Sequence, residues 1–188
     1  MILLKKYIRA VICIIWTAIK FLWIKLTRGS SFRCAPINMC SPCSEVELNQ
    51  GGILKLSKGL KMRSQSHIRV RKGATLTMGE DVSLQYGDMI VCRERIEIGN
   101  NVQLSPNVLI YDHDHDFRTK DGLKNLLYKT SPVHIGSNVW IGANTVILRG
   151  TVIEDNCVIG AGCVVKGHVK ANTVLVQKKE NIEIAIKD

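Results

Sequence analysis

The chain has 188 residues, of which 46% are hydrophobic, and it carries a formal net charge of +10. This length is sufficient for one domain with its own core and an appendage. The charge is uneven, because residues 1–72 contain 14 Lys and Arg against 2 Asp and Glu, whereas residues 73–188 contain 12 against 14. This distribution argues against a nucleic-acid surface over the whole domain. It favours contact with an anionic membrane or a phosphate-bearing acceptor, with a plain solvated basic face as the alternative.

The first apolar segment is residues 7–24, YIRAVICIIWTAIKFLWI, which we predict to be helical. Only ten uncharged residues separate Arg9 from Lys20, which is short for an unassisted membrane span. On a helix, one narrow polar stripe faces away from a broad apolar surface, and it consists of Lys6, Arg9, Cys13, Thr17 and Lys20. We therefore predict that residues 1–28 lie in the membrane interface with their cations reaching toward water. The alternatives are a true span and a helix packed on its own oligomer; a secretory signal is disfavoured, because no small-residue cleavage pattern follows.

Residues 29–45 are rich in turn-forming and polar residues and are predicted to be a linker. Cys40 and Cys43 in this segment have the spacing of zinc ligands, and Cys34 lies nearby. A closed zinc site needs four ligands and no second such pair follows, so we interpret these residues as ordinary free cysteines. The total of seven cysteines is odd, which indicates reduced thiols in a cytoplasmic protein.

Apolar residues recur at intervals of six from Val46 onward, and the clearest row is Ile135, Ile141, Ile147, Ile153, Ile159 and Val165. A helix repeats every 3.6 residues and a strand every two, so a period of six indicates a short strand and a turn in each repeat. Three repeats close one triangular coil, stacked on the next at about 4.8 Å. Residues 46–110 and 133–176 are therefore predicted to form about six coils of an all-β parallel β-helix.

The six-residue period stops over residues 111–132, YDHDHDFRTKDGLKNLLYKTSP. We expect a structureless loop here, and an excursion of this length from a compact repeat is usually functional. Its first part contains two histidines and three carboxylates: Asp112, His113, Asp114, His115 and Asp116. This cluster is the best candidate site in the chain, with metal binding as an alternative use of the same side chains.

Two segments carry a family resemblance, IGNNVQLSPNVLIYDHDHDF at 98–117 and IGSNVWIGANTVILRGTVIEDNCVIGAGCVVKG at 135–167. They resemble the hexapeptide-repeat acetyltransferases, in particular the maltose, galactoside and capsular-polysaccharide O-acetyltransferases. The resemblance implies a left-handed parallel β-helix within residues 46–176, which would be an exception to the usual right-handed crossover. It also implies a homotrimer with active sites between subunits, acetyl-CoA as the acyl donor and no metal. The C-terminal tail, residues 177–188, lacks the closing segment usual in the family.

The resemblance also implies roles for individual residues. A histidine eight residues after the asparagine of a Pro-Asn-Val segment is the family's catalytic base, which here selects His115, with His113 as the fallback. The implied donor-binding residues are Trp140, Gly142, Ala143, Ala161, Gly162 and Lys166. The candidate acceptor-binding residues are Gln85, Asp112 and Asp114. The sequence departs from the family at Arg149 and Glu154, where relatives often have proline and glycine.

These features together predict an O-acetyltransferase in which an imidazole takes the proton of a sugar hydroxyl as the hydroxyl attacks the thioester directly. An aspartate of the cluster would orient the base, and backbone N–H groups near Gly142 and Ala143 would bind the oxyanion. The basic N-terminus favours a lipid-linked or capsular glycan at the cytoplasmic face of the membrane. The alternatives are N-acylation of a nucleotide-amino sugar, a zinc enzyme like the carbonic anhydrases of this fold, and a non-catalytic membrane-tethered scaffold.

Overall fold

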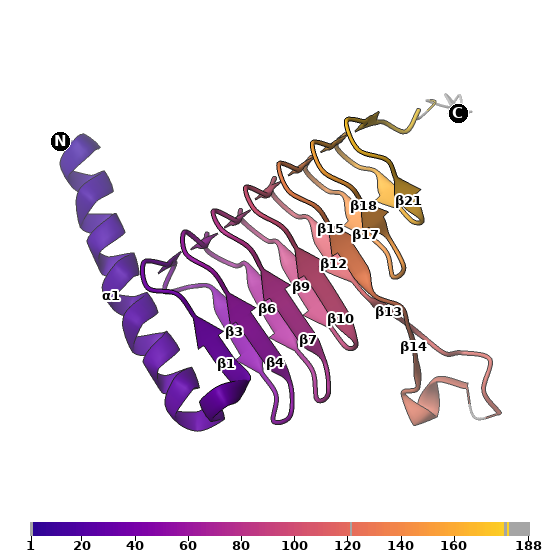
Figure 1. The fold of residues 1–188 in the computed structure, drawn as a ribbon, viewed down its shortest axis with the longest axis horizontal. Coiled ribbons are helices and arrows are strands. Elements are labelled where there is room, and N and C mark those ends of the chain that lie inside the picture. The colour runs from indigo at the N-terminus through magenta and orange to yellow at the C-terminus, as the bar shows by residue number, and fades with distance from the viewer. Residues whose placement is uncertain (1, 121, 179, 181–188) are drawn as a thin grey trace, which may run out of the picture.

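The computed structural model describes residues 2–120, 122–178 and 180. Helix α1 (Ile2–Arg28) is followed by a stack of short parallel strands that form three sheets, with a two-stranded hairpin projecting from the stack (Figure 1). The three sheets are the faces of a triangular prism, which we name faces A, B and C. The predicted parallel β-helix of about six coils, preceded by a helix, is confirmed.

The strands follow one another from face to face along the chain. Face A contains β1 (Phe32–Cys34), β4 (Ile53–Leu56), β7 (Thr75–Met78), β10 (Arg95–Ile98), β15 (Val133–Ile135), β18 (Val152–Ile153) and β21 (His168–Val169). Face B contains β2 (Met39–Cys40), β5 (Lys61–Met62), β8 (Ser83–Leu84), β11 (Gln103–Leu104), β16 (Trp140–Ile141), β19 (Val158–Ile159) and β22 (Val174–Leu175). Face C contains β3 (Glu45–Leu48), β6 (His67–Val70), β9 (Met89–Cys92), β12 (Leu109–Tyr111), β17 (Val146–Ile147) and β20 (Val164–Val165).

The first coil begins earlier than the sequence indicated. Phe32 of β1 pairs with Leu54 of β4, and Met39 of β2 pairs with Lys61 of β5. Residues 29–45, predicted as a linker, therefore contain the short 3-10 helix Gly29–Ser31 and two strands of the prism. The β-helix starts at Phe32 and not at Val46.

The interior of the prism is filled by the predicted apolar row. Its six members, from Ile135 to Val165, are each at most 3% exposed. Thr145 and Thr151 in the adjacent row are also buried, and their hydroxyls donate hydrogen bonds to the carbonyl oxygens of Gly160 at 3.1 Å and Leu148 at 2.6 Å. These bonds remove most of the cost of placing a hydroxyl inside the stack.

Asparagines stabilise the corners of the prism. Six of them adopt positive φ angles, a conformation that asparagine tolerates better than most residues: Asn101, Asn107, Asn138, Asn144, Asn156 and Asn172. Stacked members also bond to each other, as in the 2.9 Å contact from Asn101 Nδ2 to Asn138 Oδ1. The recurring asparagine thus turns the chain and joins neighbouring coils.

Helix α1 covers the N-terminal end of the stack (Figure 1). Phe21 and Ile24 are buried in the core, and the Phe21 ring meets the edge of Phe32 with 5.2 Å between centroids. The Thr17 hydroxyl accepts a 2.7 Å hydrogen bond from the Cys40 N–H, while Lys20 Nζ donates to the Ser44 carbonyl at 2.6 Å.

Cys13, Thr17 and Lys20 of the polar stripe therefore face the protein, whereas we had expected the cations of the stripe to reach toward water, as the exposed Arg9 does. The reason is that Thr17 and Lys20 satisfy backbone groups of the first coil that would otherwise be buried without partners. The opposite surface of the helix, which we call the outer face of α1, is exposed and consists of Ile8, Val11, Ile12, Ile15, Trp16, Ile19, Leu22, Trp23 and Leu26.

By length and composition alone, residues 7–31 would be able to cross a membrane. At the other end of the chain, most of the predicted C-terminal tail, residues 177–188, lies outside the described residues.

Candidate active site

The segment predicted as a structureless loop is a β-hairpin. Between β12 and β15 the chain leaves the corner of faces C and A as β13 (His113–His115) and returns as β14 (Tyr128–Thr130). His113 lies opposite Thr130, and His115 lies opposite Tyr128. The hairpin extends away from the prism in Figure 1, with the short 3-10 helix Gly122–Asn125 beyond its two strands. Both candidate histidines are therefore on ordered strands.

Asp112 anchors the base of this hairpin. Its fully buried carboxylate accepts hydrogen bonds from the backbone N–H groups of Arg93 at 2.8 Å and Glu94 at 2.7 Å. Burial raises the pKa of Asp112, but the hydrogen bonds from His113, Glu94, Arg93 and Cys92 outweigh it, so that the pKa lies below its ordinary value. Asp112 is thus an ionised group at neutral pH.

His113 is the imidazole held by that carboxylate. Its Nδ1 lies 3.1 Å from Asp112 Oδ1, and only 11% of its side chain is exposed. The rings of Tyr111 and Tyr128 meet it edge-on, with centroid distances of 5.8 and 5.5 Å. An ionised carboxylate beside Nδ1 favours the tautomer with the proton on Nδ1, which leaves Nε2 as the acceptor nitrogen.

His115 lies on the same strand but is exposed. Its ring is 4.6 Å from the ring of Tyr128, and the Arg93 guanidinium lies 3.4 Å from the centroid of that tyrosine. Of the carboxylates expected to orient a base, Asp114 binds Arg149 Nε at 2.5 Å and Asp116 binds Lys129 at 3.1 Å. Of the two candidate histidines, only His113 has a described contact with a carboxylate of the predicted cluster.

Arg149 was singled out only as a departure from the family pattern. The structure gives it a role, because its bond to Asp114 ties the hairpin to the following coil. Sequence reasoning also missed Arg93 and Tyr128, since neither stands within the Asp/His cluster or at a marked position of the repeat.

Four of the six implied donor-binding residues lie at a different corner, between faces B and C. Gly142 and Ala143 follow β16, and Ala161 and Gly162 follow β19 on the next coil. A Cβ on Gly142 would lie 2.5 Å from the Ala161 backbone nitrogen, so glycine is required here by the packing of coils. The Gly142 N–H donates to the Ile159 carbonyl at 2.8 Å, so of the predicted pair of oxyanion donors only Ala143 remains a candidate.

Trp140 and Gln85 belong to the same side of the prism as the donor corner. Trp140 points outward from face B, is 54% exposed and donates from Nε1 to Ser105 Oγ at 2.9 Å. Gln85 follows β8, and its side chain donates to Ser83 Oγ at 3.3 Å. Lys166 is exposed after β20, at the corner where the hairpin leaves.

The predicted site residues thus form two groups on one chain. The hairpin group contains both histidines and leaves from the corner of faces C and A, whereas Trp140 and the small residues line face B and its corner with face C.

The described residues contain no group of three His, Cys, Asp or Glu side chains placed to hold a metal ion. Cys40 is buried, whereas Cys34 and Cys43 are exposed. The three histidines outside the hairpin each face a glutamate, in the pairs His67–Glu45, His134–Glu97 and His168–Glu154.

The family model described as bacterial transferase hexapeptide (six repeats) matches residues 132–167. Among solved structures, a maltose O-acetyltransferase from Clostridium difficile 630 is 34% identical over 70% of this chain and 60% of that chain, with a TM-score of 0.52. A galactoside acetyltransferase in complex with coenzyme A is 27% identical over 80% and 62% of the two chains, with a TM-score of 0.54.

An N-acyltransferase from Bacillus cereus in complex with dTDP and coenzyme A shares the fold, with a TM-score of 0.65 at 17% identity over 80% of this chain and 81% of that chain. The chain spans about 60% of the length of the two sugar acetyltransferases. Among curated protein sequences, none matches the chain.

Proposed function

We propose that this chain, a hexapeptide-repeat protein similar to the maltose and galactoside acetyltransferases, is itself an acetyl-CoA-dependent sugar O-acetyltransferase. The proposal rests above all on the hairpin, which holds two imidazoles outside an otherwise regular β-helix. A structural scaffold has no need of a buried carboxylate bonded to a histidine at the base of such a hairpin.

The proposed reaction is a direct transfer. A sugar hydroxyl attacks the thioester carbon while His115 takes its proton, and backbone N–H groups at the donor corner stabilise the tetrahedral oxyanion. Collapse of this intermediate breaks the carbon–sulfur bond, and the departing thiolate takes the proton from the imidazolium. His115 is assigned as the base because it is the exposed imidazole, and a general base has to reach the acceptor hydroxyl.

His113 is then a positioning residue. Its ring is nearly buried and is fixed by Asp112, so it holds the first strand of the hairpin against the prism and thereby fixes the place of His115. The second possibility, in which His113 is itself the base, is favoured by its carboxylate contact.

The site is proposed to form between chains of a homotrimer. One chain keeps its hairpin and its donor corner on different parts of the prism, whereas two adjacent chains are able to bring the hairpin of one to face B of the other. This arrangement unites His115 with Trp140, Ala143 and Ala161 without any change in the coil structure.

The acceptor is proposed to be a lipid-linked or capsular glycan at the cytoplasmic side of a membrane. The outer face of α1 exposes large apolar side chains, including Trp16 and Trp23, which are typical of helices in the membrane interface. A trimer whose axis runs along the β-helix would place three such helices at one end, so that all three face the same membrane.

The experiment is an assay of coenzyme A release from acetyl-CoA with soluble sugars and with membrane glycolipid extracts as acceptors. His115→Ala should lower kcat about 100-fold or more, the usual scale for a lost general base. The matched control is His168→Ala, an exposed histidine paired with Glu154 on the surface of the last coils, which should retain activity.

Three results would contradict the proposal in different ways. Full activity of His115→Ala together with an inactive His113→Ala would make His113 the base. A protein without saturable affinity for coenzyme A would be a scaffold, and stoichiometric zinc without transfer of acetyl groups would favour a hydration enzyme.

A further inference from the structure

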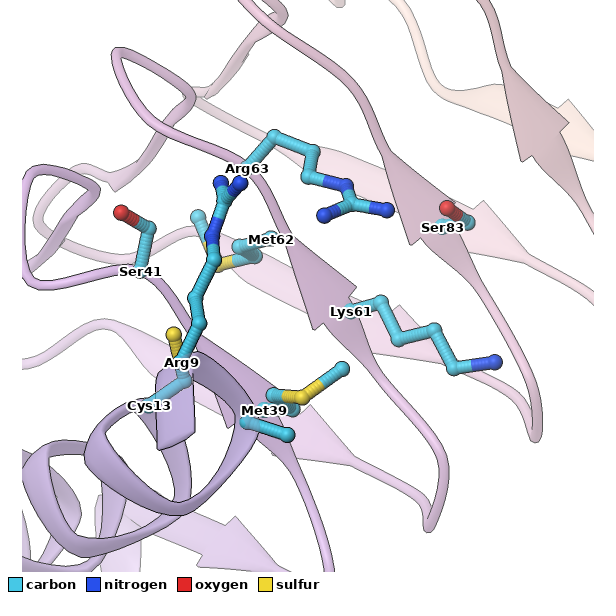
Figure 2. Close-up of a pocket in the computed structure, with 9 residues that line it drawn as sticks. Arg9, Cys13, Met39, Ser41, Lys61, Met62, Arg63 and Ser83 are labelled. Carbon is cyan, nitrogen blue, oxygen red and sulfur yellow. The ribbon is translucent and has the colours of Figure 1, made fainter. Parts of the chain in front are cut away.

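A hollow of about 320 Å³ lies between the N-terminal half of α1 and face B of the first three coils (Figure 2). Three cationic side chains line it: Arg9 from α1, and Lys61 and Arg63 from β5 and the turn that follows. Its lining contains no carboxylate, and its apolar part is formed by Cys13, Met39 and Met62. The hollow therefore combines a concentrated positive charge with an apolar wall.

Within the described part of the chain, Lys61 and Arg63 have no carboxylate at salt-bridge distance, whereas Lys58 pairs with Glu80 at 3.1 Å. Arg33 and Lys55 on face A are not ion-paired in that part of the chain either, but the hollow that they line also contains Glu80. Cations left without a counter-charge around a concave surface favour an anionic ligand.

Arg9 brings the helix and the coils together at the rim of the hollow. Its guanidinium donates to the Tyr86 hydroxyl at 3.2 Å. This hydrogen bond, the charge of Arg9 and the charge of Arg63 lower the pKa of Tyr86, which indicates that both guanidinium groups act on the same small region. Figure 2 shows the Arg9 side chain extending from the helix toward Arg63.

A second hollow, of about 420 Å³, adjoins the first and lies between α1 and the turns that follow β2 and β5, which contribute Ser41, Pro42 and Ser64. Arg9, Cys13 and Ser41 line both hollows, and Ile8 and Ile12 line only the second. These two isoleucines belong to the outer face of α1. A ligand that fills both hollows needs an anionic head and a hydrocarbon tail, which is the chemistry of a phospholipid or a polyprenyl phosphate.

We infer that the hollow binds the phosphate headgroup of a membrane lipid through Arg9, Lys61 and Arg63, with the hydrocarbon chain passing along Ile8 and Ile12. Resting on the proposed function, this lipid is the carrier to which the acceptor glycan is attached. Phosphate oxygens accept charge-assisted hydrogen bonds from guanidinium and ammonium groups, and these are among the strongest polar contacts in proteins.

The register of face B gives the direction of the attached glycan. Lys61 pairs with Ser83, Ser83 with Gln103, and Gln103 with Trp140, so these outward positions form one column. Two strand spacings separate Ser83, at the edge of the hollow, from Trp140, which is about 10 Å. A short glycan on the phosphate would therefore extend along face B toward the proposed donor site.

The test measures binding of the full chain to phosphatidylcholine vesicles that contain either polyprenyl phosphate or the same mole fraction of phosphatidylglycerol. We expect tighter binding to the polyprenyl phosphate vesicles, and the double variant Lys61→Gln, Arg63→Gln should bind them about tenfold or more weakly. The matched control is Arg33→Gln, Lys55→Gln, which removes two register-paired cations of the first two coils on face A.

An equal loss in both double variants, or an equal loss with both lipids, would mean a diffuse electrostatic attraction and would overturn the inference. Inorganic pyrophosphate tests whether a free phosphate compound binds as well as the phosphate of a lipid. If it binds as tightly as the vesicle lipid, the hydrocarbon contributes nothing and the lipid assignment is wrong.

Coenzyme A binding, measured on the same samples, separates this inference from the proposed function. It should be unchanged in the Lys61, Arg63 variant. If the wild-type chain binds polyprenyl phosphate but not coenzyme A, the proposed acetyltransferase activity is refuted, whereas the inferred lipid site is supported.

Discussion

The two halves of the β-helix are built to different dimensions. Strands β4, β7 and β10 have four residues each, and Phe32 pairs with Leu54, 22 residues further along the chain. On the same face in the second half, β18 and β21 have two residues each, and on face B Trp140 pairs with Val158, 18 residues further along. The 18-residue coil, which is three six-residue repeats long, therefore belongs to the second half, whereas coils of the first half have 20 or 22 residues.

The wider, less regular half also carries α1, the excess of positive charge and the hollow, whereas the regular half carries the proposed donor corner. The hairpin leaves the prism where the two halves meet. Under the proposed function, the regular half fixes the transfer chemistry, while the irregular half determines where the protein resides and what it accepts.

The first prediction tests whether α1 is part of the irregular half or only attached to it. Phe21→Ala removes a buried ring from the cluster around Phe32 and should destabilise the first coils by about 3–5 kcal/mol. Repeat proteins couple mainly through neighbouring units, so hydrogen exchange should accelerate in β1 and β2 and remain slow in β17. Equal acceleration in β17 would mean that the two halves unfold as one.

The second prediction concerns the outer face of α1. Ile15→Asp should weaken vesicle binding by about 1.5–3 kcal/mol, the usual contribution of burying such a side chain, without lowering the melting temperature, since Ile15 is 56% exposed. Ile37→Asp is the control, because Ile37 is 81% exposed in the first coil and does not belong to the helix. Equal loss in the two variants would remove the helix from membrane contact. Deletion of residues 1–28 is a poorer test, because it also exposes Phe32.

The third prediction compares two buried aspartates near the junction of the halves. Burial raises the pKa of Asp88 to about 7, although Val108 and Gln85 donate backbone N–H groups to it, whereas the pKa of Asp112 is lowered. Asp88 therefore binds a proton more tightly in the folded state, and its contribution to stability declines as pH rises from about 4 to 7.

Asp112 acts in the opposite direction. The contribution of Asp112 to the stability of the fold is fully present above the ordinary aspartate pKa. It is lost as pH falls through the pKa of Asp112 in the folded state, which is lower. Carboxyl ¹³C NMR should show Asp88 titrating near neutrality and Asp112 titrating below the usual range. The reverse order would show that the hydrogen bonds of the hairpin base are absent in solution.

The smallest effect is expected at Arg149. Its pair with Asp114 is partly exposed, so Arg149→Ala should cost at most about 1 kcal/mol of stability. Hydrogen exchange should nevertheless become faster in β13 and β14 than in β15. No change within the hairpin would mean that Asp112 alone holds it.

The sequence predicted the regular half well because the repeat there is strict. Each isoleucine from Ile135 to Ile159 occupies the interior position assigned to it, since a strand and turn of six residues leave no other way to bury them. The first coil was not predicted, because it lacks this strict repeat. Its strands recur after 22 residues, and Phe32 is its only large aromatic residue in the core, so no row of six marks it.

The contacts made by the candidate site residues could not be predicted from the sequence and are seen only in the structure. The Asp/His cluster was visible in the sequence, but which aspartate binds which histidine depends on where the chain leaves the prism. The polar stripe of α1 was visible in the sequence, but a single sequence does not show that Cys40 and Ser44 lie beside its Thr17 and Lys20. The hollow draws on four separate segments, and no local pattern joins Arg9 to Arg63.

The central claim is that a histidine of one chain works with the donor corner of another, and mixed trimers test it most directly. His115→Ala removes the base, and Ala161→Trp places a large ring at an exposed position of the donor corner without entering the core. Each variant alone should be inactive. Trimers reassembled from an equal mixture should recover about a quarter of the wild-type activity, the fraction of interfaces with an intact histidine on one side and an intact corner on the other. Mixtures that stay inactive, although wild-type chains reassembled in the same way are active, would contradict the account.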